Sequence, residues 1–339
     1  MKNITLLALT LLNLIIRPTG YGIARNNPPD YYLSITVSMW EEHSHSESGI
    51  AVAGYCYDLE SGKIEQVEAT VEYSSQYPLS VYDKAANTLY YSERIEDESG
   101  WHGDQLFSYN LSTREKKQLT ENIFAINYII PVSDKVYIAA IKRGEREIHV
   151  MYYSLSEEKL VESNIDSGLF FELLSYDPVS GGLFGAAYRY SEYKEALEEA
   201  NEGFGHKYIA PDYYIYDFSK DFLNPELILK TDRNLIQRLC YSKEYGLFFT
   251  QADSIPYWEP DYYSYFMDVN GKTLTSAVNI DSILYLNEFI CLYKGVFYFV
   301  GVNEQDVRGI YKYSIADENI ELVFASEDGY INGFVMLKK

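Results

Sequence analysis

The chain has 339 residues, with 35 Tyr, 16 Phe, only 10 Pro and a formal net charge of −22. This chain is longer than a typical domain with a single compact core. A closed ring of repeated sheets can be this long and still form one domain, because each repeat packs only on its neighbours. The aromatic content favours strands over helices or disorder. The acidity, without any cluster of Lys and Arg, argues against nucleic acid as a partner. A solvated, mutually repelling surface explains the charge, and a cationic partner is the alternative.

Residues 1–24 have the character of an export signal. Lys2 precedes an uncharged apolar run from Ile4 to Ile16, and Gly22-Ile23-Ala24 offers small residues for a signal peptidase. The run is shorter than the ~20 residues of a membrane-spanning helix. We therefore expect a signal peptide and an exported protein, at the cell envelope or extracellular. An uncleaved anchor, which would be the only membrane contact, and an ordinary hydrophobic N-terminus are the alternatives.

After a polar linker at residues 25–30, a repeat fills the remainder of the chain, residues 31–339. Each copy is a strand that ends in an aromatic residue or Met, then a polar residue, then an apolar residue, before a polar turn and another strand. The copies lie about 50 residues apart, the length of chain that one propeller blade requires. They occur at Tyr57-Asp58-Leu59, Tyr109-Asn110-Leu111, Tyr153-Ser154-Leu155, Tyr216-Asp217-Phe218, Met267-Asp268-Val269 and Tyr313-Ser314-Ile315.

The first blade lacks an inner strand of its own. Tyr31 to Met39 resembles the second strands of later blades, while Tyr330 to Leu337 resembles their inner strands. We therefore predict an all-β, six-bladed β-propeller of four-stranded antiparallel blades, forming a single domain and closed by the C-terminal strand completing the first blade. The expected blades are 330–337 with 31–71, then 77–120, 125–163, 170–229, 234–277 and 283–325.

The repeat resembles the six-bladed propellers of the TolB-like and low-density-lipoprotein-receptor-like class, which is found in many exported bacterial proteins. The resemblance covers residues 31 to 337 and is architectural. The receptor class has a Tyr-Trp-Thr-Asp signature, but here Tyr257-Trp258 continues as Glu259-Pro260. The resemblance thus implies the fold and transfers no functional residue.

In such a ring, the connections between second and third strands all lie on one face. Trp40, Trp101 and Trp258 fall in these connections, and so do His43, His45, His102 and His206. Aromatic and His side chains gathered at one end of a rigid scaffold are typical of a recognition surface. The alternative is that these loops are merely long and that the Trp side chains fold back onto the scaffold.

Two of these loops resemble aromatic platforms. The second, at residues 96–104, holds Trp101 and His102 close to Asp104, and the fifth, at 253–260, holds Tyr257 and Trp258 close to Asp261. Such platforms suit a sugar or a cationic side chain, through stacking or cation–π contact. Either loop can equally be a stiffened cap over its blade.

The first loop carries a possible metal-binding set. Glu41, His43, His45 and Glu47 alternate along it, so an extended strand would place them on one side, where they could bind zinc or another divalent metal. A solvated hairpin tip is the preferred interpretation. No other cofactor is expected.

A helical insertion is predicted at residues 191–203. Ser191 can cap the helix, Tyr193, Ala196, Leu197 and Ala200 form an apolar stripe, and Gly203 can end it. The stripe is expected to pack on the propeller rim, with a partner-docking helix or a lid as the alternatives.

Three cysteines, an odd number, lie within apolar strands at Cys56, Cys240 and Cys291. Buried free thiols are expected, and a Cys240–Cys291 disulfide is the alternative.

No catalytic signature is present: the sequence has no G-x-S-x-G elbow, no H-E-x-x-H and no phosphate-binding Gly loop. The preferred hypothesis is an exported, non-enzymatic binding protein that recognises a protein, peptide or glycan at the cell envelope. A glycan-active or metal-dependent enzyme using acids and His on the same face is one alternative. A scaffold subunit of an envelope assembly is the other.

Overall fold

The computed structural model of the protein describes residues 31–40, 50–68, 71–72, 75, 78–201, 210–253, 262–278, 280, 285–327 and 329–339. The expected leader and linker lie outside these residues, so export stays a prediction.

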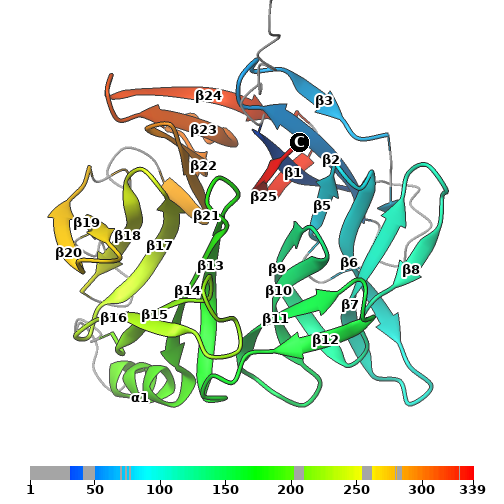
Figure 1. Ribbon diagram of the computed structural model, residues 1–339, viewed down its shortest axis with the longest axis horizontal. Coiled ribbons are helices and arrows are strands. Elements are labelled where there is room, and N and C mark those ends of the chain that lie inside the picture. The colour runs from blue at the N-terminus through cyan, green and yellow to red at the C-terminus, as the bar shows by residue number, and fades with distance from the viewer. Residues whose placement is uncertain are drawn as a thin grey trace, which may run out of the picture.

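Over this described part, the strands form six antiparallel sheets arranged in a ring (Figure 1). Blade 1 contains β25 (Gly329–Lys338), β1 (Tyr31–Trp40), β2 (Ile50–Asp58) and β3 (Ile64–Gln66), with β4 (Val71–Glu72) also paired to β2. Blade 2 contains β5 (Ser80–Asp83), β6 (Thr88–Glu96), β7 (His102–Asn110) and β8 (Lys116–Gln118). Blade 3 contains β9 (Ile123–Val132), β10 (Lys135–Lys142), β11 (Ile148–Ser154) and β12 (Lys159–Glu162).

The other three blades follow the same order from the axis outward. Blade 4 contains β13 (Leu169–Asp177), β14 (Gly182–Arg189), β15 (Tyr213–Asp217) and β16 (Glu226–Lys230). Blade 5 contains β17 (Leu235–Ser242), β18 (Gly246–Ala252), β19 (Tyr262–Asp268) and β20 (Thr273–Ser276). Blade 6 contains β21 (Tyr285–Tyr293), β22 (Val296–Val302), β23 (Arg308–Ser314) and β24 (Asn319–Ala325). The prediction of six four-stranded blades is confirmed.

The C-terminal strand closes the ring, as the sequence predicted. β25 pairs with β1 from Tyr31↔Lys338 to Met39↔Gly329, and Figure 1 shows these two strands side by side in blade 1. At the end of this pairing, the Lys339 ammonium binds the Asp58 carboxylate of β2. Partial burial alone would raise the pKa of Asp58, but hydrogen bonds from Lys339 and Ser61 outweigh it and hold the pKa well below its usual range.

A polar β-bulge recurs in the innermost strands. The ladder between first and second strands skips a polar residue in blades 1, 3, 4 and 5. These polar residues are Asn332, Asn127, Glu172 and Gln237, and the blade 3 ladder also skips Phe124. A bulge bends its strand and redirects a side chain. In blade 1, Asn332 Nδ2 donates to the carbonyl of Pro78 at 2.6 Å, which ties blade 1 to blade 2.

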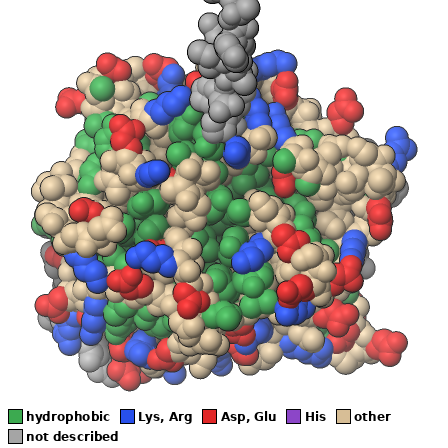
Figure 2. All heavy atoms as spheres, in the orientation of Figure 1, with side chains coloured by type: hydrophobic (Ala, Val, Ile, Leu, Met, Phe, Trp, Pro, Cys, Tyr) green, Lys and Arg blue, Asp and Glu red, His purple; other side chains and the backbone are tan. Residues whose placement is uncertain are grey.

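Aromatic rings close the axis of the ring. Tyr128 of blade 3 and Phe289 of blade 6, which face each other across the ring, lie 5.4 Å apart between ring centroids. Both are buried. A Cβ on Gly333 of β25 would lie 2.6 Å from the Phe289 ring, so only glycine fits there. Figure 2 shows hydrophobic side chains gathered around the middle of one face, with charged side chains surrounding them.

The predicted helix is present as α1 (Tyr190–Asn201), on the rim beside blade 4 (Figure 1). Tyr193, Ala196 and Leu197 pack against the core of blades 4 and 5, which confirms the rim-packing interpretation. The prediction that Ser191 caps the helix is wrong, because the helix already begins at Tyr190.

All three cysteines are free and buried, as expected. Burial raises the pKa of the Cys56 thiol to about 11 and also raises the pKa of Cys240 and Cys291. At neutral pH these thiols therefore stay protonated and inert.

Candidate functional site: the loop face and a groove between blades 1 and 6

In every blade, the second strand ends and the third begins on the same side of the ring, because successive strands are antiparallel. We call this side the loop face. It is marked by the strand ends Trp40 and Ile50, Glu96 and His102, Lys142 and Ile148, Arg189 and Tyr213, Ala252 and Tyr262, and Val302 and Arg308. The opposite side, the turn face, carries the tight turns such as 83–88, 132–135, 177–182 and 242–246.

On blade 2, the loop is shorter than expected. β7 already begins at His102, so only residues 97–101 connect the strands, and the expectation that His102 and Asp104 lie in the loop is wrong. His102 is exposed, and its Nδ1 lies 3.7 Å from a carboxylate oxygen of Glu96. Asp104 is only 2% exposed and accepts a hydrogen bond from Ser75 at 2.9 Å. A ligand at the surface therefore meets His102 and not Asp104.

Trp101 is half-buried between two blades. Its indole lies against the backbone of Gly103, where a Cβ would come within 2.3 Å of the ring, and Arg143 of blade 3 covers it at 4.4 Å. The Arg143 guanidinium also donates to Asp97 at 2.7 Å and to Ser99 at 3.3 Å. We call Asp97, Ser99, Trp101, Gly103 and Arg143 the Trp101 clamp. Trp101 thus holds blades 2 and 3 together at the loop face and presents only part of its surface to a ligand.

The clamp has a predicted pH dependence. The Ser99 hydroxyl, together with the Trp101 amide and the Arg143 guanidinium, lowers the pKa of Asp97. Because folding lowers the pKa of Asp97, its ionised carboxylate contributes its full stabilisation at pH values above the pKa of an ordinary Asp. That stabilisation is lost as the pH falls through the lower pKa of the folded state. Asp97→Asn should therefore lower the melting temperature at pH 7, with the difference from wild type vanishing in strong acid. Glu98→Gln is the matched control, and an equal loss in both variants would contradict the clamp.

The neighbouring turn on blade 3 is held by a cluster of charges. His149 is buried, with Nε2 2.7 Å from Glu145 and Nδ1 3.1 Å from Glu162. Lys142 contacts both carboxylates, at 3.1 and 2.9 Å. Together with the Trp101 clamp, this cluster makes the blade 2–3 part of the loop face a rigid surface.

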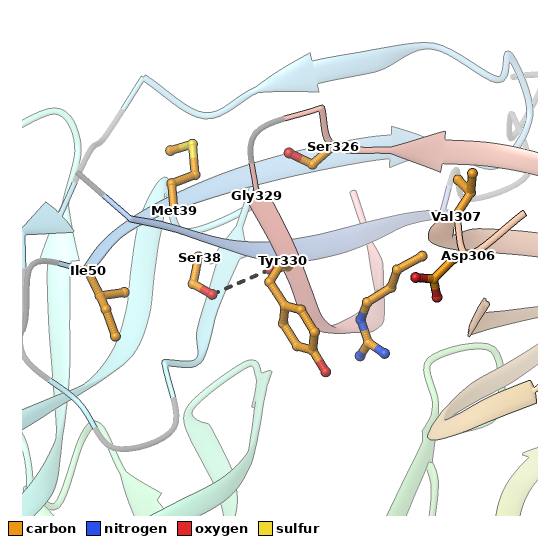
Figure 3. A pocket seen from close by; sticks show the side chains of 9 residues that line it. Ser38, Met39, Ile50, Asp306, Val307, Ser326, Gly329 and Tyr330 are labelled. Carbon is orange, nitrogen blue, oxygen red and sulfur yellow. Dashed lines mark hydrogen bonds between the residues drawn. The ribbon is translucent and has the colours of Figure 1, made fainter. Parts of the chain in front are cut away.

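A groove opens on the loop face between blades 1 and 6 (Figure 3). It has a volume of about 670 Å³. In Figure 3, the Tyr330 ring lies between Met39 and Ile50 on one side and Val307 and Asp306 on the other. The lining residues are Ser38, Met39, Ile50, Asp306, Val307, Arg308, Ser326, Gly329 and Tyr330.

The Arg308 guanidinium and the Asp306 turn of this groove are held by neighbouring groups. Arg308 Cζ lies 4.1 Å from the centroid of the Tyr330 ring, and Arg308 Nε donates to the carbonyl of Ile331 at 2.9 Å. Asp306 sits in a turn with a left-handed φ of 60°, and Asn303 Oδ1 accepts from the amide of Val307 at 2.9 Å. These contacts fix the Arg308 guanidinium and the backbone of the Asp306 turn beside the Tyr330 ring, which belongs to a residue that is 55% exposed.

Neither a protein-family model nor a curated protein sequence matches this chain. Solved structures do match. One is a chain of the crystal structure of a nidogen/laminin complex, with 10% identity, a TM-score of 0.52, and coverage of 90% of this chain and 98% of that chain. Another is TolB from Acinetobacter baumannii, with 14% identity, a TM-score of 0.54, and coverage of 90% of this chain and 66% of that chain. The shared feature is the β-propeller fold.

Several predicted site residues lie outside the described part of this propeller, so their roles stay predictions. They are His206, Tyr257, Trp258 and Asp261 of the expected ligand site and Glu41, His43, His45 and Glu47 of the expected metal site. The backbone of Trp40 ends β1 beside the groove. Among the residues that are described, no three His, Cys, Asp or Glu side chains are placed to hold a metal ion. Within the same residues, no helix is long and apolar enough to cross a membrane.

The groove was missed by sequence reasoning. Arg308 and Tyr330 come from different blades and meet only because β25 enters blade 1. No local pattern could have signalled this pair.

Proposed function

We propose that this protein is an exported, non-enzymatic propeller that recognises a protein or peptide partner at the cell envelope through its loop face. The proposal rests chiefly on one observation: the loop face carries an open groove with an exposed tyrosine and an Arg308 guanidinium held by a backbone carbonyl. Concave sites with a few positioned polar groups among apolar ones are typical of recognition. Export is supported by the Lys2 and Ile4–Ile16 pattern of the sequence.

Two further points support recognition on a face. Aromatic side chains from opposite blades meet at the axis, which leaves the faces as the accessible surfaces. The fold neighbour from a nidogen/laminin complex is a precedent for a chain of this fold in a protein assembly.

Site-directed shielding tests the proposal. Because the native thiols are buried and protonated, maleimide-polyethylene glycol should react only with an introduced cysteine. The exposed positions Arg146 and Glu304 lie on the loop face, whereas Val179 and Glu244 lie on the turn face. Each is replaced by Cys singly, PEGylated, immobilised and exposed to envelope extract of the source cells.

We expect the immobilised protein to retain a macromolecule from the extract. Shielding of the loop face should abolish this binding, and shielding of the turn face should leave it unchanged. Retention that disappears only with turn-face shielding, or no retention by the unshielded protein, would contradict the proposal. Mass spectrometry of the retained material distinguishes a protein or peptide from a glycan.

A further inference from the structure

We propose that the groove between blades 1 and 6 binds a carboxylate group of an extended peptide, with Arg308 as the anion-binding residue and Tyr330 as its aromatic platform. This inference rests on the proposed function and names the chemistry of its partner.

The Arg308 guanidinium has an unused hydrogen-bond donor. Its Nε is already used by the Ile331 carbonyl, and one face of the group lies on Tyr330. Its Nη2 has no hydrogen-bond acceptor within the described part of the chain and is buried in the free protein, so a ligand pairs with it after a small shift of the partly exposed Arg308 side chain. A buried donor without an acceptor is costly, and a planar guanidinium fits a carboxylate best because two parallel hydrogen bonds can form.

A negative charge lies in the same groove as Arg308. Asp306 lines the same groove, yet no ion pair joins it to Arg308 in the described structure. Its turn is closed by the amide of Asp306 donating to the Asn303 carbonyl at 2.9 Å, which fixes the backbone from which the carboxylate extends. An extended peptide carries backbone N–H groups beside its carboxylate, and these are suitable donors for Asp306.

Apolar side chains line the groove beside the two charged residues. Met39, Ile50 and Val307 line the groove around the exposed Tyr330 ring (Figure 3). Their side chains suit an apolar residue next to the carboxylate of the ligand.

The net charge of −22 restricts the ligand further. A run of acidic residues would be repelled by the surface as a whole, whereas repulsion of one carboxylate is screened beyond about 8–10 Å. We therefore infer a peptide with a single carboxylate flanked by apolar residues. That carboxylate is either a chain terminus or an acidic side chain.

Four pools of N-acetylated pentapeptides with random Ala, Val, Leu and Phe test this inference. One pool has a free C-terminal carboxylate and one has a central Glu with an amidated C-terminus. Their matched pools replace the carboxylate by an amide, through C-terminal amidation or a central Gln. Each pool is incubated with the full chain, and the bound peptides are quantified by affinity-selection mass spectrometry.

The wild type should enrich at least one carboxylate pool about tenfold over its amide counterpart, as expected for a charge-assisted pair of hydrogen bonds. The enriched pool identifies the source of the carboxylate. Arg308→Gln and Tyr330→Ala should abolish this preference, and Arg308→Lys should restore part of it. Tyr330 is exposed, so its removal should leave the fold intact even if Arg308→Gln does not fold.

Lys135→Gln is the matched control, because Lys135 lies 4.4 Å over the Tyr152 ring on the turn face. It should leave the enrichment unchanged. Equal enrichment of carboxylate and amide pools, no enrichment by the wild type, or an unchanged preference in folded Tyr330→Ala overturns the inference. If the peptide test fails but shielding of the loop face still blocks the natural partner, the proposed function stands and only the carboxylate inference fails. If peptides bind but shielding of the loop face has no effect on the natural partner, the proposed function fails instead.

Discussion

Removal of residues 329–339 is expected to abolish cooperative folding. β25 is the innermost strand of blade 1, and its loss exposes the whole edge of β1. It also removes the buried side chains Ile331, Phe334, Met336 and Leu337. Burial of each contributes about 1.5–3 kcal/mol, so together they are comparable to the ~5–15 kcal/mol that stabilises a typical domain. Circular dichroism and thermal melting of the truncated chain test this expectation.

Two controls separate strand closure from the terminal charge. Lys339→Ala removes the ion pair with Asp58, a partly exposed contact, while leaving β25 in place, and should cost at most about 1 kcal/mol. A synthetic peptide of residues 329–339 should restore cooperative melting to the truncated chain. A truncated chain that melts cooperatively near the wild-type temperature would show that the ring does not depend on this strand.

Phe289→Ala is expected to destabilise the protein by about 3–5 kcal/mol, the usual cost of removing a buried aromatic side chain. The Phe289 ring joins three innermost strands, since it contacts Tyr128 of blade 3 and lies against Gly333 of blade 1. The cavity left at the axis cannot collapse easily, because the ring of blades holds its walls apart. Urea denaturation measures the loss in free energy of unfolding.

Phe124→Ala is the matched control for this substitution. Phe124 also lies in an innermost strand, but it is 42% exposed. Its replacement should cost clearly less than Phe289→Ala, because a large part of the Phe124 side chain is already exposed to water and no enclosed cavity is left. Equal costs at the two positions would mean that Phe289 does not close the axis.

Closure of the ring could be predicted because it depends on a residue pattern that each inner strand carries within its own sequence. Tyr330 to Leu337 has the residue pattern of an inner strand, and its only unfilled place was in blade 1. The bulges of the innermost strands were missed, although the sequence does carry their signal. A polar residue interrupts the apolar run of four inner strands, at Asn332, Asn127, Glu172 and Gln237. An alignment of these four strands with one another would have revealed the shared bulge.

The candidate site was predictable only at the level of a face. Strand alternation places Trp101 and His102 on the loop face, but it does not reveal that Arg143 of the next blade covers the indole. Asp104 was expected at the surface because the length of its hairpin turn cannot be read from composition. Contacts between blades join residues that are distant in sequence, and a single-strand pattern carries no information about them.

Recognition through the loop face is tested most directly by amide hydrogen exchange of the full chain, alone and saturated with its retained partner. The account predicts slowed exchange confined to loop-face segments, including 303–308 and 329–332, with unchanged exchange in the turn-face segments 83–88, 132–135, 177–182 and 242–246. Protection of the turn-face segments, with the loop-face segments unchanged, would contradict it.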